Sequence, residues 1–294
     1  MGFFGMFKEA GKITFSWKKL FSHIFLATIL PLAILYLSDI QISYFIDHHT
    51  YQNNRNAKNT AHVITRVIYS ILTLLFYLLS TSTVVYTVSC FYTSKDTNFK
   101  KVIDVFSKVW GRILVTFLLF FFVLAICTIL YLGLLYWFVA TIDGPAYKAF
   151  SIIIAFTIPY LIVFVYTAIV WNMAMVISVL EKDYGRKALV KSMKLLYGKI
   201  WVSSAVFVVL EIIFAGTIIA FSLLVLNRNI LNLVGNIFVG IACYLLLPVL
   251  FHFSLVIQAV TYFVCKAYHN EDISNIAAHL DISYVTLGRR NEVV

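Results

Sequence analysis

Hydrophobic and polar residues follow one another along this 294-residue chain in long blocks, not at the short spacing of a soluble fold. Apolar runs longer than about 18 residues are typical of transmembrane helices, because about 20 residues cross a ~30 Å hydrocarbon layer. Six runs reach that length: residues 20–38, 67–90, 113–138, 149–180, 201–226 and 233–265. They lack the ten-residue alternation of barrel strands. The pattern predicts an all-α, polytopic membrane helix bundle with six transmembrane helices.

Two polar, basic segments interrupt this pattern, at residues 93–112 and 181–200. Shifting the sequence by 87 residues aligns Lys95-Asp96 with Lys182-Asp183, and Gly111-Arg112 with Gly198-Lys199. Each segment follows an even-numbered span and precedes an odd-numbered one. The two segments are therefore predicted to be copies of one repeated unit.

Within each copy the apolar residues recur at the spacing of one helix face. The first stripe comprises Phe99, Val102, Ile103, Phe106, Val109 and Trp110, and the second comprises Leu189, Met193, Leu196 and Ile200. Basic residues occupy the other face: Lys100, Lys101, Lys108 and Arg112 in the first copy, and Arg186, Lys187, Lys191 and Lys194 in the second. We expect basic amphipathic helices that lie in the membrane interface. Asp96 and Asp183 stand where an acid favours the positive end of such a helix.

The N-terminus is predicted to hold a third copy, with a stripe of Ile13, Trp17, Leu20 and Ile24. A fourth, weaker helix is expected in the C-terminal tail. The six spans then form three hairpins in a single integral membrane domain over residues 1–294. We divide it into residues 1–66 (interfacial helix, span 1 and outer loop), 67–180 (spans 2–4), 181–265 (interfacial helix and spans 5–6) and 266–294 (cytoplasmic tail).

The charge distribution predicts the orientation of the chain. Only 12% of the residues are charged, the net charge is +10, and 62% of the residues are hydrophobic. With both termini in the cytoplasm, 18 of the 23 lysines and arginines lie on the cytoplasmic side, as the positive-inside rule requires. The basic segments are expected to contact anionic lipid headgroups. No nucleic-acid partner is expected, since the basic residues are divided among short segments beside a membrane.

Residues 181–198 read Glu181, Ala188-Leu189, Ser192, Leu195 and Gly198 at fixed spacing. This pattern resembles the "E…AL..S..L..G" stretch of the membrane domains that accompany bacterial glycerophosphodiester phosphodiesterases. The tail "YFVCKAYHNEDI…HLDISYVTLG" resembles a plant-specific, uncharacterised family of six-span transmembrane proteins, and this second resemblance covers essentially the whole chain. Both imply a fold and no chemistry, because the bacterial activity belongs to a separate soluble domain.

Four polar residues within the spans are candidates for an intramembrane site, because such residues are costly in lipid. They are Glu211 in span 5, His252 and Gln258 in span 6, and Asn172 in span 4. Glu211 and His252 both lie near mid-depth, so a contact between them is geometrically possible. The alternative is that the four side chains form interhelical hydrogen bonds that only hold the bundle together. Helix breaks are expected at Pro31, Pro159 and Pro248.

Sequence motifs for nucleotide binding, zinc binding or a serine nucleophile are absent, so no enzyme activity, metal or cofactor is expected. The outer-loop histidines His48, His49 and His62 do not have the spacing of a metal site. Cys90 and Cys265, at span ends, are either palmitoylation sites or small apolar residues.

The predicted function is a non-enzymatic, multi-pass membrane protein that organises or handles lipids or small polar molecules. Its membrane, endomembrane or plasma membrane, and its oligomeric state stay open. One alternative is a transporter or channel that uses a polar site around Glu211. Another is a membrane adaptor that binds a cytoplasmic protein partner.

Overall fold

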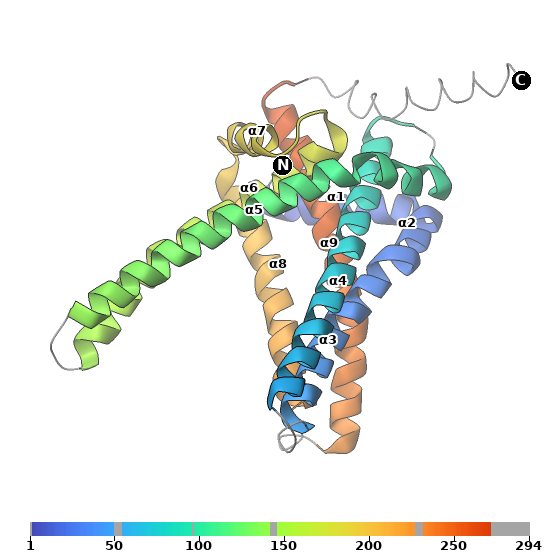
Figure 1. The fold of residues 1–294 in the computed structure, drawn as a ribbon. Coiled ribbons are helices and arrows are strands. Elements are labelled where there is room, and N and C mark those ends of the chain that lie inside the picture. Colours follow the sequence, from blue (N-terminus) through green and yellow to red (C-terminus); the bar gives the residue numbers. More distant parts are fainter. Residues whose placement is uncertain (1, 50–54, 96, 142–145, 227–231, 272–294) are drawn as a thin grey trace, which may run out of the picture. The chain divides into compact units, whose positions relative to one another are not determined.

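The computed structural model of the chain describes residues 2–49, 55–95, 97–141, 146–226 and 232–271, and within them it contains helices and no strand (Figure 1). The elements up to the second span are α1 (Phe3–Ser16), α2 (Lys18–Ile24), the π-helical turn η1 (Phe25–Ile29), α3 (Leu30–His49) and α4 (Arg55–Tyr92). They are followed by α5 (Phe99–Thr141), α6 (Ala146–Leu180), α7 (Arg186–Leu196), α8 (Ile200–Ala220), the π-helical turn η3 (Phe221–Leu226) and α9 (Leu233–Tyr268). The all-α prediction is confirmed.

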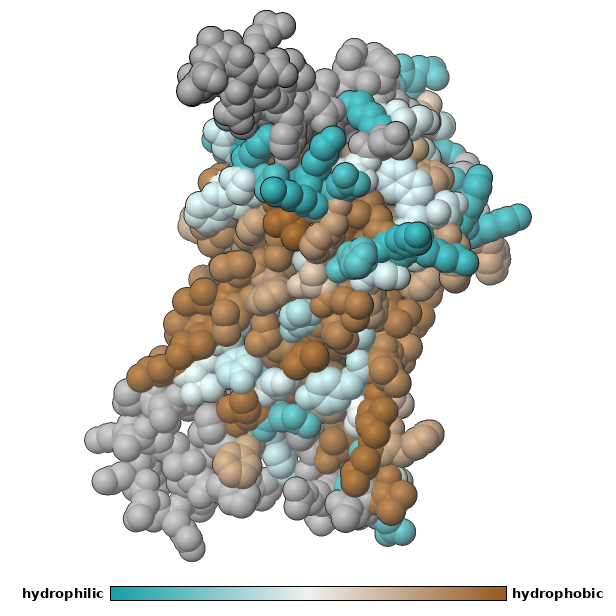
Figure 2. All heavy atoms as spheres, turned by 90° about the vertical axis from the view of Figure 1, so that its right-hand side faces the viewer, coloured by the Kyte–Doolittle hydropathy of each residue, from teal (hydrophilic) through white to brown (hydrophobic). Residues whose placement is uncertain are grey.

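The described helices contain six stretches that are long and apolar enough to cross a membrane, and each overlaps one predicted span. They are Lys18–Phe45, Val63–Tyr92, Phe99–Thr141, Ile153–Leu180, Ile200–Val225 and Val234–Tyr268. Hydrophobic side chains cover much of the surface that these helices present (Figure 2). Phe122, Ile129 and Phe238, for example, are each more than 60% exposed. Such surfaces are stable in contact with lipid, not with water.

The chain folds into two compact units. One unit comprises Met1–Trp110 and Val206–Thr261, and the other comprises Gly111–Ala205 and Tyr262–Val294. The helices α5, α8 and α9 each begin in one unit and end in the other. Each unit has at least one helical hairpin of its own.

The first unit is built from two helical hairpins. In one hairpin α3 packs along α4. In the other, α8 and η3 run antiparallel to α9, as the ring contacts Phe214–Phe251 (5.2 Å) and Phe221–Tyr244 (5.8 Å) show. The buried core that joins the hairpins consists of Ala33, Leu37, Phe221, Cys243 and Leu247.

The three prolines are accommodated within helices. Pro31 is the second residue of α3, just after the π-helical turn η1, and the wider turn leaves room for a residue that donates no backbone hydrogen bond. Pro159 and Pro248 lie inside α6 and α9, which continue on both sides. The prolines therefore do not end any of the described spans.

The second unit contains one long hairpin and α7. The part of α5 from Gly111 onward runs antiparallel to α6, with stacked ring pairs Phe120–Trp171 (4.5 Å) and Tyr131–Tyr160 (4.3 Å). Helix α7 follows the end of α6 and packs back along it. The hairpin, α7 and the end of α9 from Tyr262 onward thus position the residues of the candidate site.

The structure differs from the predicted interfacial helices in three respects. The stretch expected to form a separate helix before span 3 is the first part of α5, which passes through Gly111 without a break. On α7 the buried face consists of Ala188, Ser192, Leu195 and Leu196, whereas Met193 is 46% exposed. The N-cap of α7 is Gly185 and not Asp183. Asp96 and the predicted fourth helix in residues 272–294 lie outside the described residues.

Candidate functional site

The basic residues of α7 lie on a face that its packing leaves open. Small side chains, Ala188 and Ser192, let the helix approach α6 closely. Lys187, Lys191 and Lys194 follow at i, i+4 and i+7 and so share a different face. The α7 segment therefore carries three lysines on the side that does not pack against α6.

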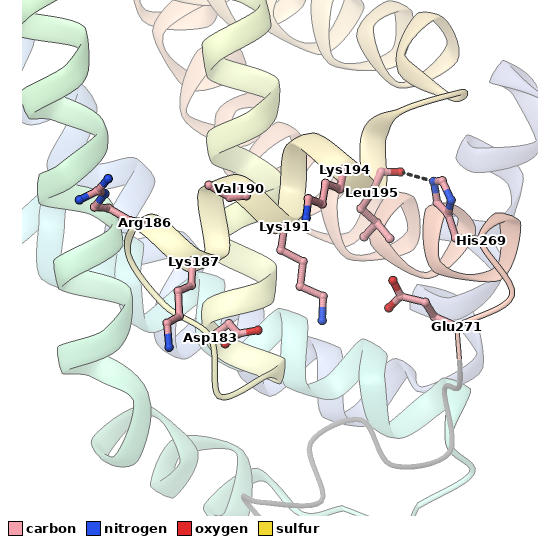
Figure 3. Close-up of a pocket in the computed structure, with 9 residues that line it drawn as sticks. All are labelled: Asp183, Arg186, Lys187, Val190, Lys191, Lys194, Leu195, His269 and Glu271. Atoms are coloured by element: carbon pink, nitrogen blue, oxygen red, sulfur yellow. Dashed lines mark hydrogen bonds between the residues drawn. The ribbon is translucent and has the colours of Figure 1, made fainter.

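These lysines border a cleft of about 950 Å³. Its lining residues are Asp183, Arg186, Lys187, Val190, Lys191, Lys194, Leu195, His269 and Glu271 (Figure 3). Four of the nine are basic and two are acidic. A cleft of this size can hold a small polar molecule or a headgroup, since ligand sites typically measure about 300–1,000 Å³.

Glu181, directly after α6, contacts both α7 and α9, the elements that surround the cleft. Its carboxylate accepts hydrogen bonds from Lys191 Nζ on α7 (2.5 Å) and from the Tyr262 hydroxyl on α9 (2.6 Å). Lys266 Nζ lies 3.2 Å from the same carboxylate. The side chains of Glu181 and Lys266 are only 12% and 8% exposed. One buried carboxylate thus joins α7 to the ends of two membrane-spanning helices.

The electrostatics of this cluster favour the charged forms. Burial alone raises the pKa of the Glu181 carboxyl, but hydrogen bonds from Lys191 and Tyr262 and the charges of Lys266 and Lys191 outweigh it and hold that pKa below its ordinary value. Burial lowers the pKa of Lys191, but Glu181, Glu271 and Asp183 together raise it above its ordinary value. The Glu181–Lys191 pair is therefore ionised at neutral pH.

The C-terminal end of α7 is fixed by a second set of contacts. Gly198 has φ of +88°, and a Cβ atom there would lie 2.8 Å from the Tyr268 ring. Nε2 of His269 lies 3.1 Å from the carbonyl oxygen of Leu195 and 3.2 Å from that of Tyr197, so it donates to the end of α7. Gly198 and His269 therefore place α7 against α9 independently of Glu181.

The other predicted lipid-contact residues lie near the start of α5. Lys100, Lys101 and Lys108 belong to the first unit, and Arg112 belongs to the second. Lys100 and Lys101 are exposed, and Lys108 and Arg112 are partly buried. None of these four lines the cleft on α7.

The structure describes no contact between Glu211 and His252, two residues of the predicted intramembrane site. In the first unit, Glu211 is exposed on α8. His252 on α9 is only 5% exposed, and its Nε2 lies 3.2 Å from Thr14 Oγ1. Among the described contacts, no hydrogen bond or ion pair joins Glu211 to His252.

The remaining two candidates are Gln258 and Asn172. Gln258 is 2% exposed on α9 in the first unit, and Asn172 is partly buried on α6 in the second. Both have interaction partners in the structure.

The cysteines and the outer-loop histidines add no chemistry to the described part. Cys90 and Cys265 are buried in the fold, which favours their interpretation as small apolar residues over palmitoylation sites. Within the described residues no cluster of His, Cys, Asp and Glu could hold a metal ion. The side chains of His48, His49 and His62 lie outside the described part.

The structure brings three residues together at the candidate site that the sequence did not point to as site residues: Glu181, Tyr262 and Lys266. Glu181 could be identified only as the first position of a resemblance pattern. The pattern's other positions now have physical roles, because Ala188, Ser192 and Leu195 are buried and Gly198 has a positive φ.

Comparison with known proteins yields a match over nearly the whole chain. The model of a family described as "Domain of unknown function (DUF8558)" matches residues 1–292. No curated protein and no solved structure matches the chain. The resemblances to plant six-span proteins and to the bacterial membrane domains stay predictions.

Proposed function

The chain belongs to the DUF8558 family, and we propose that it is a non-enzymatic, multi-pass membrane protein that binds and organises anionic lipids at the cytoplasmic leaflet. The basic cleft on α7 carries this proposal. The orientation rests on the excess of basic residues in the segments that would then face the cytoplasm.

The free charges of the cleft support anion binding. Lys191 is paired with Glu181, but Arg186, Lys187 and Lys194 make no ion pair with a described acid. Basic residues near an anionic leaflet each contribute about 1 kcal/mol of attraction. An unpaired group of this kind is therefore well suited to phosphate-bearing headgroups.

The surroundings of the cleft support a lipid as the source of the anion. Val190 and Met193 of α7 are 53% and 46% exposed, although they are apolar. They border the basic face, so α7 combines an exposed apolar strip with three lysines. We infer that α7 is an amphipathic helix lying in the interface. Lys100, Lys101, Lys108 and Arg112 would extend its basic surface.

The test is a pair of substitutions, Lys187→Gln with Lys194→Gln, in the full-length protein in neutral detergent. Loss of two charges at about 1 kcal/mol each predicts roughly 30-fold weaker binding of phosphatidylserine. Bound lipid is counted by native mass spectrometry during a titration.

Lys182→Gln is the matched control, because Lys182 is an exposed lysine of the same segment that does not line the cleft. Equal affinities of the double variant and the control would contradict the proposal.

The alternative of a transporter or channel has one observation in its favour. Glu211 is exposed although it lies within an apolar span, and a carboxylate in lipid is costly unless water or a partner reaches it. Among the described residues, no hydrogen bond or ion pair satisfies it.

Single cysteines at Val208 and Ala215, on the same helix face as Glu211, distinguish these functions in a chain without the four native cysteines. The lipid-organising function predicts protection from a membrane-impermeant thiol reagent at both positions. Labelling at both would favour the transporter. The adaptor alternative concerns residues 266–294, most of which lie outside the described part.

A further inference from the structure

Two acidic residues line the basic cleft, so a ligand that carries a positive group as well as a negative one fits it better than a simple anion does. Asp183 and Glu271 line the same cavity as Lys187, Lys191 and Lys194. In the view of Figure 3, the ammonium groups of Lys187 and Lys191 extend to the same side of α7, with Asp183 between them and Glu271 beyond Lys191. The cleft thus offers both signs of charge to a bound molecule.

The two acids make few direct contacts in the described structure. Asp183 precedes the N-cap, Gly185, and makes no hydrogen bond or ion pair with a described residue. Glu271 is 40% exposed and lies 3.6 Å from Lys266, whose closer partner is Glu181. Both carboxylates lie near enough to Lys191 to act on its charge. Asp183 and the exposed part of Glu271 can therefore contact a ligand in addition to Lys191 and Lys266.

Not every basic residue that lines the cleft can contact a bound phosphate. Glu181 holds Lys191, and in Figure 3 the side chain of Arg186 points away from Lys187 and Lys191. Lys187 and Lys194 remain for a phosphate group. A headgroup that carried only negative charge would also face Asp183 and Glu271, and like charges brought together oppose binding.

We propose that, among the anionic lipids, this cleft prefers a phospholipid headgroup that carries an amine beside its phosphate, as in phosphatidylserine. The phosphate lies against Lys187 and Lys194, and the ammonium group lies against Asp183 and Glu271. The acyl chains extend along the exposed apolar strip of Val190 and Met193. This assignment rests on the proposed function and names the ligand class of the same site.

The test compares two anionic lipids, phosphatidylserine and phosphatidylglycerol, in titrations of the full-length protein followed by native mass spectrometry. Wild type is expected to bind phosphatidylserine about fivefold more tightly than phosphatidylglycerol. Asp183→Asn is expected to abolish this preference, and Glu271→Gln to reduce it. Asp104→Asn, which removes an acid outside the cleft, is expected to leave it unchanged.

The results distinguish a failure of the amine-bearing headgroup from a failure of the proposed lipid binding. Equal affinities for the two lipids in wild type, with binding still weakened by Lys187→Gln and Lys194→Gln, would overturn the amine assignment alone. Binding that does not respond to the lysine substitutions would overturn the proposed function. A soluble headgroup without acyl chains, glycerophosphoserine, is added as a competitor. If it competes as strongly as phosphatidylserine, the headgroup does not need to come from a lipid, and that part of the proposal is overturned. Loss of the preference in Asp183→Asn and a smaller preference in Glu271→Gln, with no change in Asp104→Asn, would support the assignment.

Discussion

Replacing Glu181 with glutamine is expected to lower the free energy of unfolding by about 3 kcal/mol, because it removes one partner of a largely buried ion cluster. Lys266, which is 8% exposed, then keeps Glu271 at 3.6 Å as its one carboxylate partner among the described residues. Lys191 loses its ion pair, and the hydrogen bond that the Tyr262 hydroxyl donates loses its charged acceptor. Thermal unfolding in detergent, followed by size-exclusion chromatography, measures the loss.

A second substitution isolates the cause of this loss. Lys266→Met in the Glu181→Gln background removes the buried charge that has lost its main partner, so it is expected to restore part of the stability. Glu271→Gln is the matched control, since Glu271 is more exposed and contacts the same lysine at a longer distance. A loss in Glu271→Gln as large as in Glu181→Gln would show that Glu181 has no special role.

The pH dependence should change with the same substitution. The pKa of Glu181 lies below its ordinary value of 4.5, so its stabilising contribution is complete above that value and is lost as the pH falls through the lower, folded-state pKa. The difference in stability between wild type and Glu181→Gln should therefore be constant near neutral pH and shrink below about pH 4.5. A difference that persists in acid would contradict the ionised pair.

The spans were predictable because the criterion for them is local. A run of about 20 apolar residues is sufficient to predict a membrane-spanning helix, whatever lies elsewhere in the chain. The contacts of Glu181 are not local, since they join it to residues 10, 81 and 85 positions away. No periodicity in the sequence indicates such pairs. Only the resemblance pattern marked Glu181 as noteworthy.

The repeated segments show where pattern reasoning fails. Gly111 and Gly198 occupy equivalent positions in the 87-residue repeat, yet Gly111 lies within a continuous helix and Gly198 has a positive φ. The difference comes from the neighbours that each segment meets, here the Tyr268 ring beside Gly198. Glycine permits a break in the helix but does not require one. The sequence therefore predicted both basic segments but not which one forms its own helix.

The apolar stripes were misassigned for a similar reason. In a soluble protein an exposed apolar residue is unfavourable, so periodicity identifies the buried face. In a membrane protein the lipid-facing side is also apolar, and the protein-facing side is often built from small residues. On α7 the buried positions include Ala188 and Ser192, whereas the larger Met193 is exposed. Size, more than hydrophobicity, distinguishes the two faces.

Thr116→Val is expected to destabilise the second unit by about 2–3 kcal/mol, although the two side chains have nearly the same shape. The Thr116 hydroxyl is fully buried on α5. It accepts a hydrogen bond from the backbone N–H of Gly185 at 2.8 Å and lies 2.7 Å from the Ser178 hydroxyl. Valine leaves the buried N–H without this acceptor, and an orphaned buried donor costs about 1–3 kcal/mol.

Thr116→Ser provides the matched control for this prediction, because serine keeps the hydroxyl and removes only a methyl group. Its loss should be about 1 kcal/mol, the value of one buried methylene-sized group. Since Gly185 is the N-cap of α7, Thr116→Val should also weaken lipid binding in the cleft, whereas Thr116→Ser should not. Similar losses in the two variants would mean that packing, and not the hydroxyl, holds the start of α7. A larger loss of unfolding free energy in Thr116→Val than in Thr116→Ser would show that α5 positions α7 and its lysines through the Thr116 hydroxyl.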